Sequence, residues 1–231
     1  MKFFGIQKTS TVDYPGKLCT TLFTKGCNMR CTYCYNVDLV YPRNWLPFYE
    51  ESEILEYVLS RQDLIPAICI TGGEPTVHTE LPLFIAKLKS YGFYVKLDTN
   101  GTNPKMLLEL FAKGLIDYVA MDIKTSMSEY MALTKLRPHF LQNILETIEL
   151  LKTSGVEHEF RTTLVNGHHT DSVIVQIAEL AKHAPNFYLQ RAQQEKAPCK
   201  SVRTEADFTD SDMKRFLHVV QRIIPHAQLR I

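Results

Sequence analysis

Residues 18–36, LCTTLFTKGCNMRCTYCYN, join a short apolar run to three closely spaced cysteines. Residues 18–24 are predicted to form a strand that leads into Cys27, Cys31 and Cys34. Thiolates are soft ligands that suit zinc, copper(I) and iron–sulfur clusters. A structural zinc site closes with four protein ligands and a disulfide needs a pair of cysteines. An odd, tight trio therefore predicts a metal centre that keeps one coordination position open.

Beyond this stretch, apolar strand patterns alternate with helical patterns along the chain. The predicted strands are 18–24, 67–71, 93–98, 118–123, 159–165 and 187–190, and the predicted helices are 51–61, 81–91, 104–113, 138–153, 171–183 and 211–223. Alternation of this kind predicts an α/β fold with a parallel sheet and right-handed crossovers. Six strand-helix units without a sign of sheet reversal favour a partial (β/α)6 barrel. A doubly wound open sheet is an alternative that periodicity does not exclude.

Length and composition are those of an ordinary globular protein, with 231 residues, 45% of them hydrophobic and 22% charged. We expect a single domain over 1–231, with a core at about 10–190 and a last helix at about 211–223. The net charge of +1 gives no strong field to attract nucleic acid or an anionic membrane. The sequence shows neither a signal peptide nor a membrane span, so we expect a cytoplasmic protein with no membrane partner.

The remaining cysteines differ from the trio in their surroundings. Cys19 and Cys69 lie in apolar strands, where free cysteine usually behaves as a small buried hydrophobe, and Cys199 lies in a distant polar loop. In a reducing compartment, clustered cysteines are more often metal ligands or catalysts than disulfides. The trio is therefore expected to bind its metal alone, and a zinc site completed by a histidine is the alternative.

Polar residues gather where the predicted strands end. The strand ends and their loops carry Gly72, Gly73, Glu74, Asp98, Asp122 and Lys124, and Arg161 lies inside the fifth strand. In parallel α/β barrels, chemistry collects at the carboxyl ends of the strands. We therefore expect these residues and the cysteines to face one mouth. Trp45 is a candidate anchor for a partner protein or a cap of the barrel.

The segment CNMRCTYC at 27–34 resembles the Cys-x3-Cys-x-aromatic-Cys signature of the radical S-adenosylmethionine (SAM) enzymes. The segments STVDYPGK at 10–17 and FTKGCN at 23–28 resemble the glycyl-radical-enzyme activating proteins, in particular those of anaerobic ribonucleoside-triphosphate reductase. The resemblance covers about 10–161 and is weaker beyond. It implies a radical SAM partial barrel with a 4Fe–4S cluster on three cysteines, whose open iron binds SAM.

In the family that these segments resemble, the reduced cluster gives one electron to SAM. SAM then splits into methionine and a 5′-deoxyadenosyl radical, which abstracts a hydrogen atom. The resemblance thus implies an oxidoreductase whose partner is a glycyl radical enzyme, with flavodoxin or ferredoxin as electron donor. Two alternatives stay open: an activase of pyruvate formate-lyase type, and a radical SAM enzyme acting on a small molecule of purine or deazapurine type.

The resemblance also implies roles for individual residues. Gly72, Gly73 and Glu74 resemble the motif that contacts the methionyl amino group, although a Gly-Gly pair is also common in simple turns. Arg161 resembles the basic residue that holds the SAM carboxylate, and guanidinium geometry suits that group. A salt bridge at the barrel mouth is the structural alternative for Arg161.

Asp98 and Asp122 resemble aspartates that bind a monovalent cation beside SAM in the pyruvate formate-lyase branch. Lys124 resembles a lysine that contacts the SAM region, and an Asp–Lys ion pair is the alternative. Tyr33 is expected to pack over the cluster and to present its backbone to adenine. Asn36 follows the family's Cys-x-Asn pattern, whereas the residue before it is tyrosine where many activases have histidine.

Overall fold

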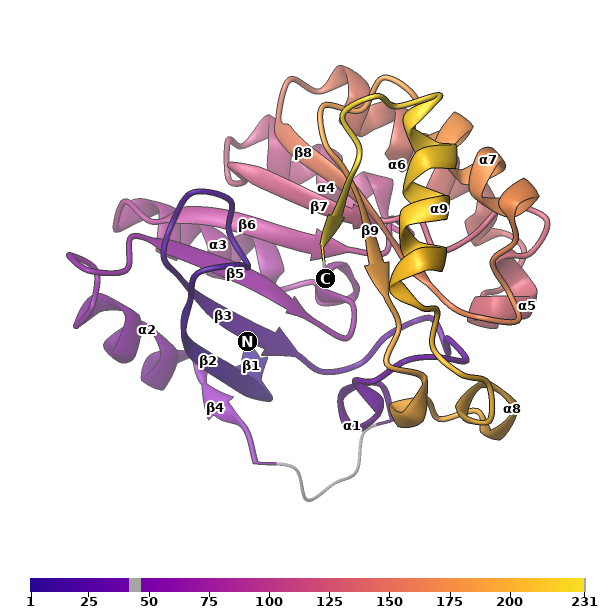
Figure 1. Cartoon of the computed structure of the whole chain (residues 1–231). Helices are drawn as coiled ribbons and strands as arrows, with labels where there is room; N and C mark the ends of the chain where they lie inside the picture. Colours follow the sequence, from indigo (N-terminus) through magenta and orange to yellow (C-terminus); the bar gives the residue numbers. More distant parts are fainter. Residues whose placement is uncertain (42–46, 231) are drawn as a thin grey trace. The chain divides into compact units, whose positions relative to one another are not determined.

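The computed structural model describes residues 1–41 and 47–230 (Figure 1). The chain divides into two compact units. The first unit comprises Met1–Asn28, Asp38–Thr99 and Asn103–Val119, and the second comprises Met29–Val37, Asn100–Thr102 and Ala120–Ile231. Trp45 lies outside the described residues. The expected single domain over 1–231 stays a prediction.

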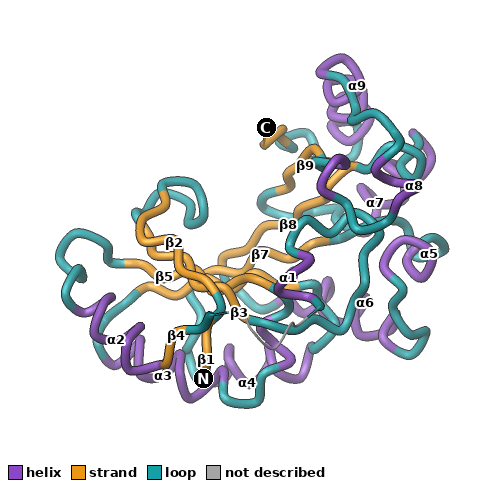
Figure 2. Tube along the Cα trace, turned by 90° about the horizontal axis from the view of Figure 1, so that it is seen from below, coloured by secondary structure: helices purple, strands orange, loops and turns teal. Residues whose placement is uncertain are grey.

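The first unit contains a mixed sheet with three parallel strands. The strands β3 (Cys19–Thr24), β5 (Ala67–Gly72) and β6 (Tyr94–Thr99) are parallel, and β2 (Gly5–Ser10) pairs antiparallel with β3. Two short strands, β1 (Lys2–Phe3) and β4 (Tyr49–Glu50), pair separately. The helices are α2 (Glu51–Leu59), α3 (Leu81–Ser90) and α4 (Pro104–Ala112), with the 3-10 turn η1 (Pro75–Val77) and the short α1 (Val37–Val40), which starts in the second unit. Helices α2, α3 and α4 lie on one side of these strands (Figure 2).

The local sequence explains these elements. Ile68 and Ile70 in β5 and Leu97 in β6 are fully buried, as expected for strands that helices cover. Asn103 caps α4 by accepting a hydrogen bond from the Met106 N–H at 3.2 Å, and Pro104 takes the first helical position.

The second unit continues the alternation of parallel strands and helices. The strand β7 (Tyr118–Asp122) starts in the first unit and is followed in the second by β8 (Glu157–Leu164), β9 (Phe187–Arg191) and β10 (Gln228–Arg230), with neighbours in the order β10-β9-β8-β7. The pairs β8–β9 and β9–β10 are parallel. The helices are α5 (Tyr130–Thr134), α6 (Phe140–Thr153), α7 (Asp171–Leu180), α8 (Lys200–Arg203) and α9 (Asp210–Gln221), with the 3-10 turn η2 (Gln194–Lys196).

All six predicted strands and all six predicted helices are present, with ends that shift by at most three residues. Within each unit the strands neighbour one another in chain order, β6-β5-β3 in the first and β9-β8-β7 in the second. This order agrees with the predicted partial (β/α)6 barrel. The antiparallel β2, the short strands β1, β4 and β10, and the short helices were not predicted.

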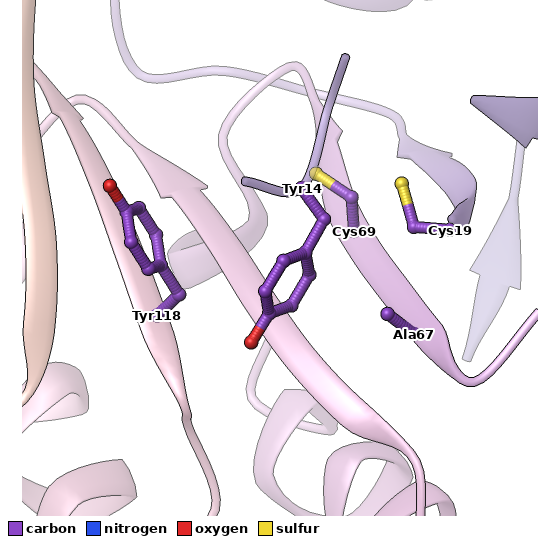
Figure 3. Packing of buried hydrophobic residues seen from close by; sticks show 5 residues of the cluster. All are labelled: Tyr14, Cys19, Ala67, Cys69 and Tyr118. Carbon is purple, nitrogen blue, oxygen red and sulfur yellow. The ribbon is translucent and has the colours of Figure 1, made fainter. Parts of the chain in front are cut away.

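The DYPGK segment contributes one residue, Tyr14, to the core of the first unit. Tyr14 is 3% exposed and packs with Cys19, Ala67, Cys69 and Tyr118 (Figure 3). The rings of Tyr14 and Tyr118 lie 6.0 Å apart between centroids. The expectation that Cys19 and Cys69 are buried is confirmed, since both are 0% exposed.

Candidate active site

The Gly72-Gly73 pair lets the end of β5 approach the chain that leaves β3. The Gly73 N–H donates to the Thr24 carbonyl at 2.9 Å, and the Glu74 N–H donates to the Gly26 carbonyl at 2.7 Å. A Cβ at position 73 would lie 1.9 Å from the Gly26 oxygen, and one at position 72 would lie 2.4 Å from the Thr24 nitrogen. The glycines thus bring two backbone segments together one residue before Cys27.

The Glu74 carboxylate links this loop to the end of β6. It is 1% exposed, and its Oε1 atom accepts hydrogen bonds from the hydroxyls of Thr76 at 2.6 Å and Thr99 at 2.7 Å. A buried carboxylate needs several donors of this kind to offset its lost hydration. Glu74 therefore holds Thr99, the residue that directly follows Asp98, in place by a hydrogen bond.

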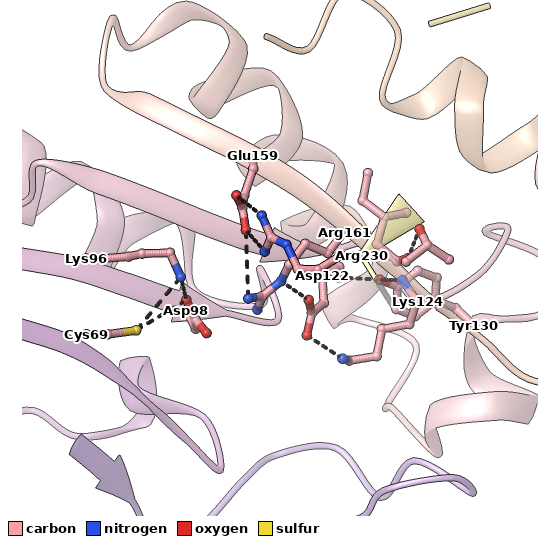
Figure 4. Close-up of polar contacts among 11 residues, drawn as sticks. Cys69, Lys96, Asp98, Asp122, Lys124, Tyr130, Glu159, Arg161 and Arg230 are labelled. Atoms are coloured by element: carbon pink, nitrogen blue, oxygen red, sulfur yellow. Dashed lines mark hydrogen bonds and ion pairs between the residues drawn. The ribbon is translucent and has the colours of Figure 1, made fainter. Parts of the chain in front are cut away.

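Asp98 lies on β6 with an ion-pair partner from its own strand. The ammonium of Lys96 bonds to the Asp98 carboxylate, and the Cys69 sulfur lies 3.8 Å from Asp98 Oδ1 (Figure 4). Lys96 is 1% exposed. This lysine was not among the predicted site residues, although its spacing of two from Asp98 places both side chains on one face of a strand.

In the second unit, the residues around Cys31 and Cys34 run beside the end of α5. The Arg30 N–H donates to the Thr134 carbonyl at 2.7 Å, and the Thr32 N–H donates to the Leu133 carbonyl at 2.9 Å. The Cys199 N–H also donates to the Thr32 carbonyl, at 3.3 Å. The fold thus brings Cys199 beside a loop from which it is distant in the sequence.

The electrostatic surroundings of Cys34 act in two directions. Burial raises the pKa of its thiol above the ordinary value. A hydrogen bond from the Asn36 backbone and the positive charges of Lys124 and Arg30 oppose that rise. These groups stabilise a thiolate, the form of cysteine that binds metal.

Tyr33, between the two cysteines, is almost completely buried at 6% exposure. Burial raises the pKa of its phenol well above the ordinary value, so the hydroxyl stays protonated. That hydroxyl is buried without a hydrogen-bond partner among the residues that the structure describes. The surrounding polar groups that influence it include Lys124, Asp122 and Tyr130.

A network of charged side chains joins β7 and Lys124, just beyond its end, to β8 and β10 (Figure 4). Asp122 accepts a hydrogen bond from Arg161 Nε at 2.9 Å and one from Lys124 Nζ at 3.0 Å. Glu159, which is 0% exposed, pairs with Arg230 and lies 3.9 Å from Arg161 Nη1. Positive and negative groups thus alternate along the network.

Ionisation within this network is strongly favoured. Burial alone would raise the pKa of Asp122, but the charges of Arg161 and Lys124 outweigh it and hold that pKa well below the ordinary value. Burial would lower the pKa of Lys124, but the Asp122 charge raises it well above the ordinary value. Arg161 is therefore held by a charged carboxylate, in an orientation set before any ligand binds.

Within each unit, the structure brings most of the predicted site residues together. The first unit places Gly72 beside Thr24 and places Gly73 and Glu74 beside Gly26, and Glu74 bonds to Thr99, the residue after Asp98. The second unit joins Asp122, Lys124 and Arg161, with Tyr33 influenced by the first two. Sequence reasoning did not select Lys96, Glu159 or Arg230. The spacing of two within strands was the available signal for Lys96 and Glu159.

The cysteine trio matches the donor set of an iron–sulfur cluster. Among residues 1–41 and 47–230, no three His, Cys, Asp or Glu side chains converge on a single metal ion. A 4Fe–4S cluster does not require its cysteines to converge on one point, because each cysteine binds a different iron atom. Cys31 is buried, and Cys27 and Cys34 are partly exposed. Three soft ligands on one loop, one shielded from water, fit such a cluster with one iron left for another ligand.

A family model of the radical SAM superfamily matches residues 21–181. The chain belongs to the radical SAM superfamily. The cofactors of this superfamily are a 4Fe–4S cluster and SAM, so the expected cofactors are confirmed at the level of the family. In the described part of this radical SAM protein, no helix has both the length and the hydropathy needed to span a membrane.

Similar proteins of known name belong to more than one branch. The chain is 31% identical over 232 residues to a Methanocaldococcus jannaschii protein named "Putative glycyl-radical enzyme activating enzyme", covering 98% of this chain and 94% of that protein. It is also 31% identical to the GTP 3′,8-cyclase of Helicobacter pylori, covering 72% of this chain but only 51% of the cyclase.

Solved structures agree on the fold. Streptococcus suis SuiB bound to S-adenosylmethionine matches with a TM-score of 0.71 at 13% identity, covering 90% of this chain and 49% of SuiB. Escherichia coli QueE matches with a TM-score of 0.56 at 13% identity, covering 99% of this chain and 93% of QueE. At such identities the likeness shows the fold alone, and it agrees with the predicted α/β partial barrel.

Proposed function

We propose that this radical SAM enzyme is an activating enzyme that generates a glycyl radical on a partner protein, an anaerobic ribonucleoside-triphosphate reductase. The observation that carries the proposal is the 31% identity to a protein named as a glycyl-radical enzyme activating enzyme, over 98% of this chain and 94% of that protein. The DYPGK segment, which resembles activases of the reductase, supports the choice of partner. A cytoplasmic location belongs to the same proposal.

Cys27, Cys31 and Cys34 would hold the cluster, and their loop would leave one iron open. The bound cluster and SAM would supply the one-electron cleavage of SAM that starts radical chemistry. The protein's own contribution is to bind, to orient and to exclude water.

Arg161 is the proposed ligand of the SAM carboxylate. Its Nε atom is engaged by Asp122, so the guanidinium enters binding with its orientation fixed. Lys124, on the other oxygen of Asp122, would add positive charge near the same carboxylate. Fixing these groups before binding reduces the entropy lost when SAM is ordered.

Gly72, Gly73 and Glu74 would form the edge that meets the methionyl amino group. The glycines hold this segment against Gly26, the residue before Cys27. Tyr33 would cover the cluster, and Asn36, whose backbone bonds to Cys34, would stabilise that loop. Flavodoxin or ferredoxin is the proposed electron donor.

The test is electron paramagnetic resonance. The protein is reconstituted with iron and sulfide without oxygen, reduced, and mixed with SAM and the anaerobic ribonucleotide reductase of the same organism. A glycyl-radical doublet is expected, and it should disappear with the Cys31→Ala protein. Formation of 5′-deoxyadenosine without a doublet would remove the reductase as partner and direct the assay to pyruvate formate-lyase.

A second candidate is chemistry on a small molecule of purine or deazapurine type. It is favoured by a segment 36% identical over 93 residues to the 7-carboxy-7-deazaguanine synthase of Aquifex aeolicus, although that match covers only 39% of this chain. Incubation of the reduced protein with SAM and candidate purines, followed by mass spectrometry, would reveal a modified purine. The activase proposal predicts no such product.

A further inference from the structure

Lys96 is a buried lysine inside the first unit. Its side chain is 1% exposed, and that of Asp98, which it contacts, is 14% exposed. Lysine is almost never buried to this degree without a charged partner, because the ammonium loses its hydration. The Lys96–Asp98 pair is therefore a buried ion pair within the strand and not a solvated surface contact.

The pairing follows from strand geometry. Lys96 and Asp98 are two residues apart on β6, so their side chains leave the same face. On the neighbouring parallel strand, Cys69 lies opposite Lys96, and its sulfur is 3.8 Å from Lys96 Nζ and 3.8 Å from Asp98 Oδ1. Burial raises the pKa of this thiol well above its ordinary value, so it contributes no charge.

One more acidic group, Asp13, influences Cys69 and is held by a residue of the next strand, β3. Thr21 lies opposite Cys69 on β3 and donates its hydroxyl hydrogen to Asp13 at 2.7 Å. The Asp13 charge is thus engaged by a hydrogen-bond donor of its own. Lys96 and Asp98 form the directly paired charges of this face, one positive and one negative.

The ion pairs of Asp98 and Asp122 do not fit the monovalent metal ion that was expected at these two aspartates. Asp98 already has a cation from its own chain, and within the second unit Asp122 has two, Arg161 and Lys124. A further positive ion at either carboxylate would meet the repulsion of these charges in surroundings that water screens poorly. Each aspartate behaves as an internally neutralised group.

We infer that Lys96 takes the place of a monovalent metal ion at Asp98, so that this protein needs neither potassium nor sodium to bind SAM. The inference rests in part on the proposed function, because SAM binding is one of its readouts. The charge is supplied by a side chain, so dialysis cannot remove it.

The test replaces Lys96 by methionine, which has a similar length but no charge. Removing one partner of a buried ion pair leaves an uncompensated charge, which a small cation can then neutralise. The unfolding temperature of the cluster-free chain and the SAM affinity of the reconstituted protein are measured in potassium, sodium and tetramethylammonium chloride at equal ionic strength. The matched control is Lys89→Met, which removes a lysine paired with Asp117 at 2.7 Å in the same unit.

The wild-type protein and Lys89→Met are expected to show the same values in all three salts. Lys96→Met should bind SAM about tenfold more tightly in potassium or sodium than in tetramethylammonium, and should unfold at a higher temperature there. If Lys96→Met does not fold, the double variant Lys96→Met, Asp98→Asn removes both charges and should fold with no salt preference.

Two results would overturn the inference. One is a wild-type protein whose SAM affinity or unfolding temperature rises with potassium or sodium, and the other is a Lys96→Met protein as indifferent to the cation as the wild type. A wild-type chain that does not bind SAM in any salt would contradict the proposed function instead. The unfolding temperatures of the cluster-free proteins would still decide the role of Lys96.

Discussion

Arg230 and Glu159 form a two-pronged ion pair, with Nη1–Oε1 and Nη2–Oε2 distances of 2.8 and 3.0 Å. Glu159 is 0% exposed, and Arg230 also lies over the Tyr188 ring at 3.8 Å from its centroid. Glu159 in turn lies 3.9 Å from Arg161, the proposed SAM ligand. Arg230, on the short strand β10, therefore neutralises the buried Glu159 carboxylate. Without Arg230, Glu159 would depend on Arg161 for an opposite charge.

Arg230→Met should destabilise the fold and weaken SAM binding together. The loss leaves Glu159 buried with a weaker partner, which costs about 3 kcal/mol of unfolding free energy. Urea unfolding measures the first effect, and equilibrium dialysis with labelled SAM measures the second. Arg222→Met, at an exposed position, is the control and should change neither by a measurable amount. A stable Arg230→Met protein with unchanged SAM affinity would contradict this role.

Arg161→Ala should weaken SAM binding at least tenfold, because the SAM carboxylate loses its proposed guanidinium partner, while the fold persists. The fold persists because Asp122 keeps Lys124 and Glu159 keeps Arg230 as ion-pair partners. Arg161→Lys should recover little affinity, since an ammonium cannot reproduce the planar fork of a guanidinium. Dialysis with labelled SAM checks both variants, and full recovery by lysine would show that only charge matters.

The sequence predicted the main elements because their patterns are local. Six apolar strands and six amphipathic helices follow from the spacing of apolar residues, as Leu97 and the helix cap Asn103 illustrate. The strand β10 was missed because three residues carry almost no periodic signal, and the residues of β9 with which it pairs lie 40 positions earlier. Arg230 could not be assigned without that pairing.

For the candidate site, the sequence indicated residues but not their partners. Asp98 and Asp122 were predicted to bind a monovalent cation beside SAM because they resemble aspartates of the pyruvate formate-lyase branch. Their ion pairs with Lys96 and Arg161 depend on which face each side chain takes and on how buried it is. The glycines at 72 and 73 were expected to approach a ligand, whereas the structure also shows them contacting the chain's own backbone.

Loss of any trio cysteine should abolish the cluster, whereas Cys199→Ala should retain it. Cys31→Ala removes a ligand, and the reconstituted protein should then hold well under the roughly four iron atoms per chain of an intact cluster. Cys199 is the stringent control because its backbone bonds to Thr32, beside the trio. Iron assays and the visible spectrum measure both. Loss of iron from Cys199→Ala would make Cys199 a ligand.

Gly73→Ala should lower the free energy of unfolding more than Gly16→Ala does. Gly16 has a positive φ but open space around a new Cβ, whereas Gly73 has no such space. The new Cβ would lie 1.9 Å from the Gly26 oxygen and would push β5 from the cluster loop, costing about 3 kcal/mol by overpacking. Gly16, with φ of +70° and no atom within 4 Å of a Cβ, is the control. Gly16→Ala should cost about 1 kcal/mol for its backbone conformation alone. Equal unfolding free energies for the two variants would refute this account.

Stability should fall as the pH drops from 7 to 4, because His169 is buried in its neutral form. Its Nδ1 atom accepts a hydrogen bond from the Val165 N–H at 2.9 Å, so Nε2 carries the proton and donates to the Lys124 carbonyl at 2.9 Å. Burial lowers the pKa of this imidazole from 6.5 to about 4. A proton on Nδ1 would also remove the acceptor of the Val165 N–H.

The sign of the effect follows from proton binding. Between pH 6.5 and about 4 the unfolded chain binds a proton at His169 that the folded chain does not, so acid favours unfolding. The stabilisation is complete above pH 6.5, and His169 alone accounts for a loss of about 3 kcal/mol by pH 4. Urea unfolding across this range measures it, and His169→Gln should flatten the pH dependence. An unchanged slope in His169→Gln would assign the effect to other groups, such as His158, whose pKa burial also lowers.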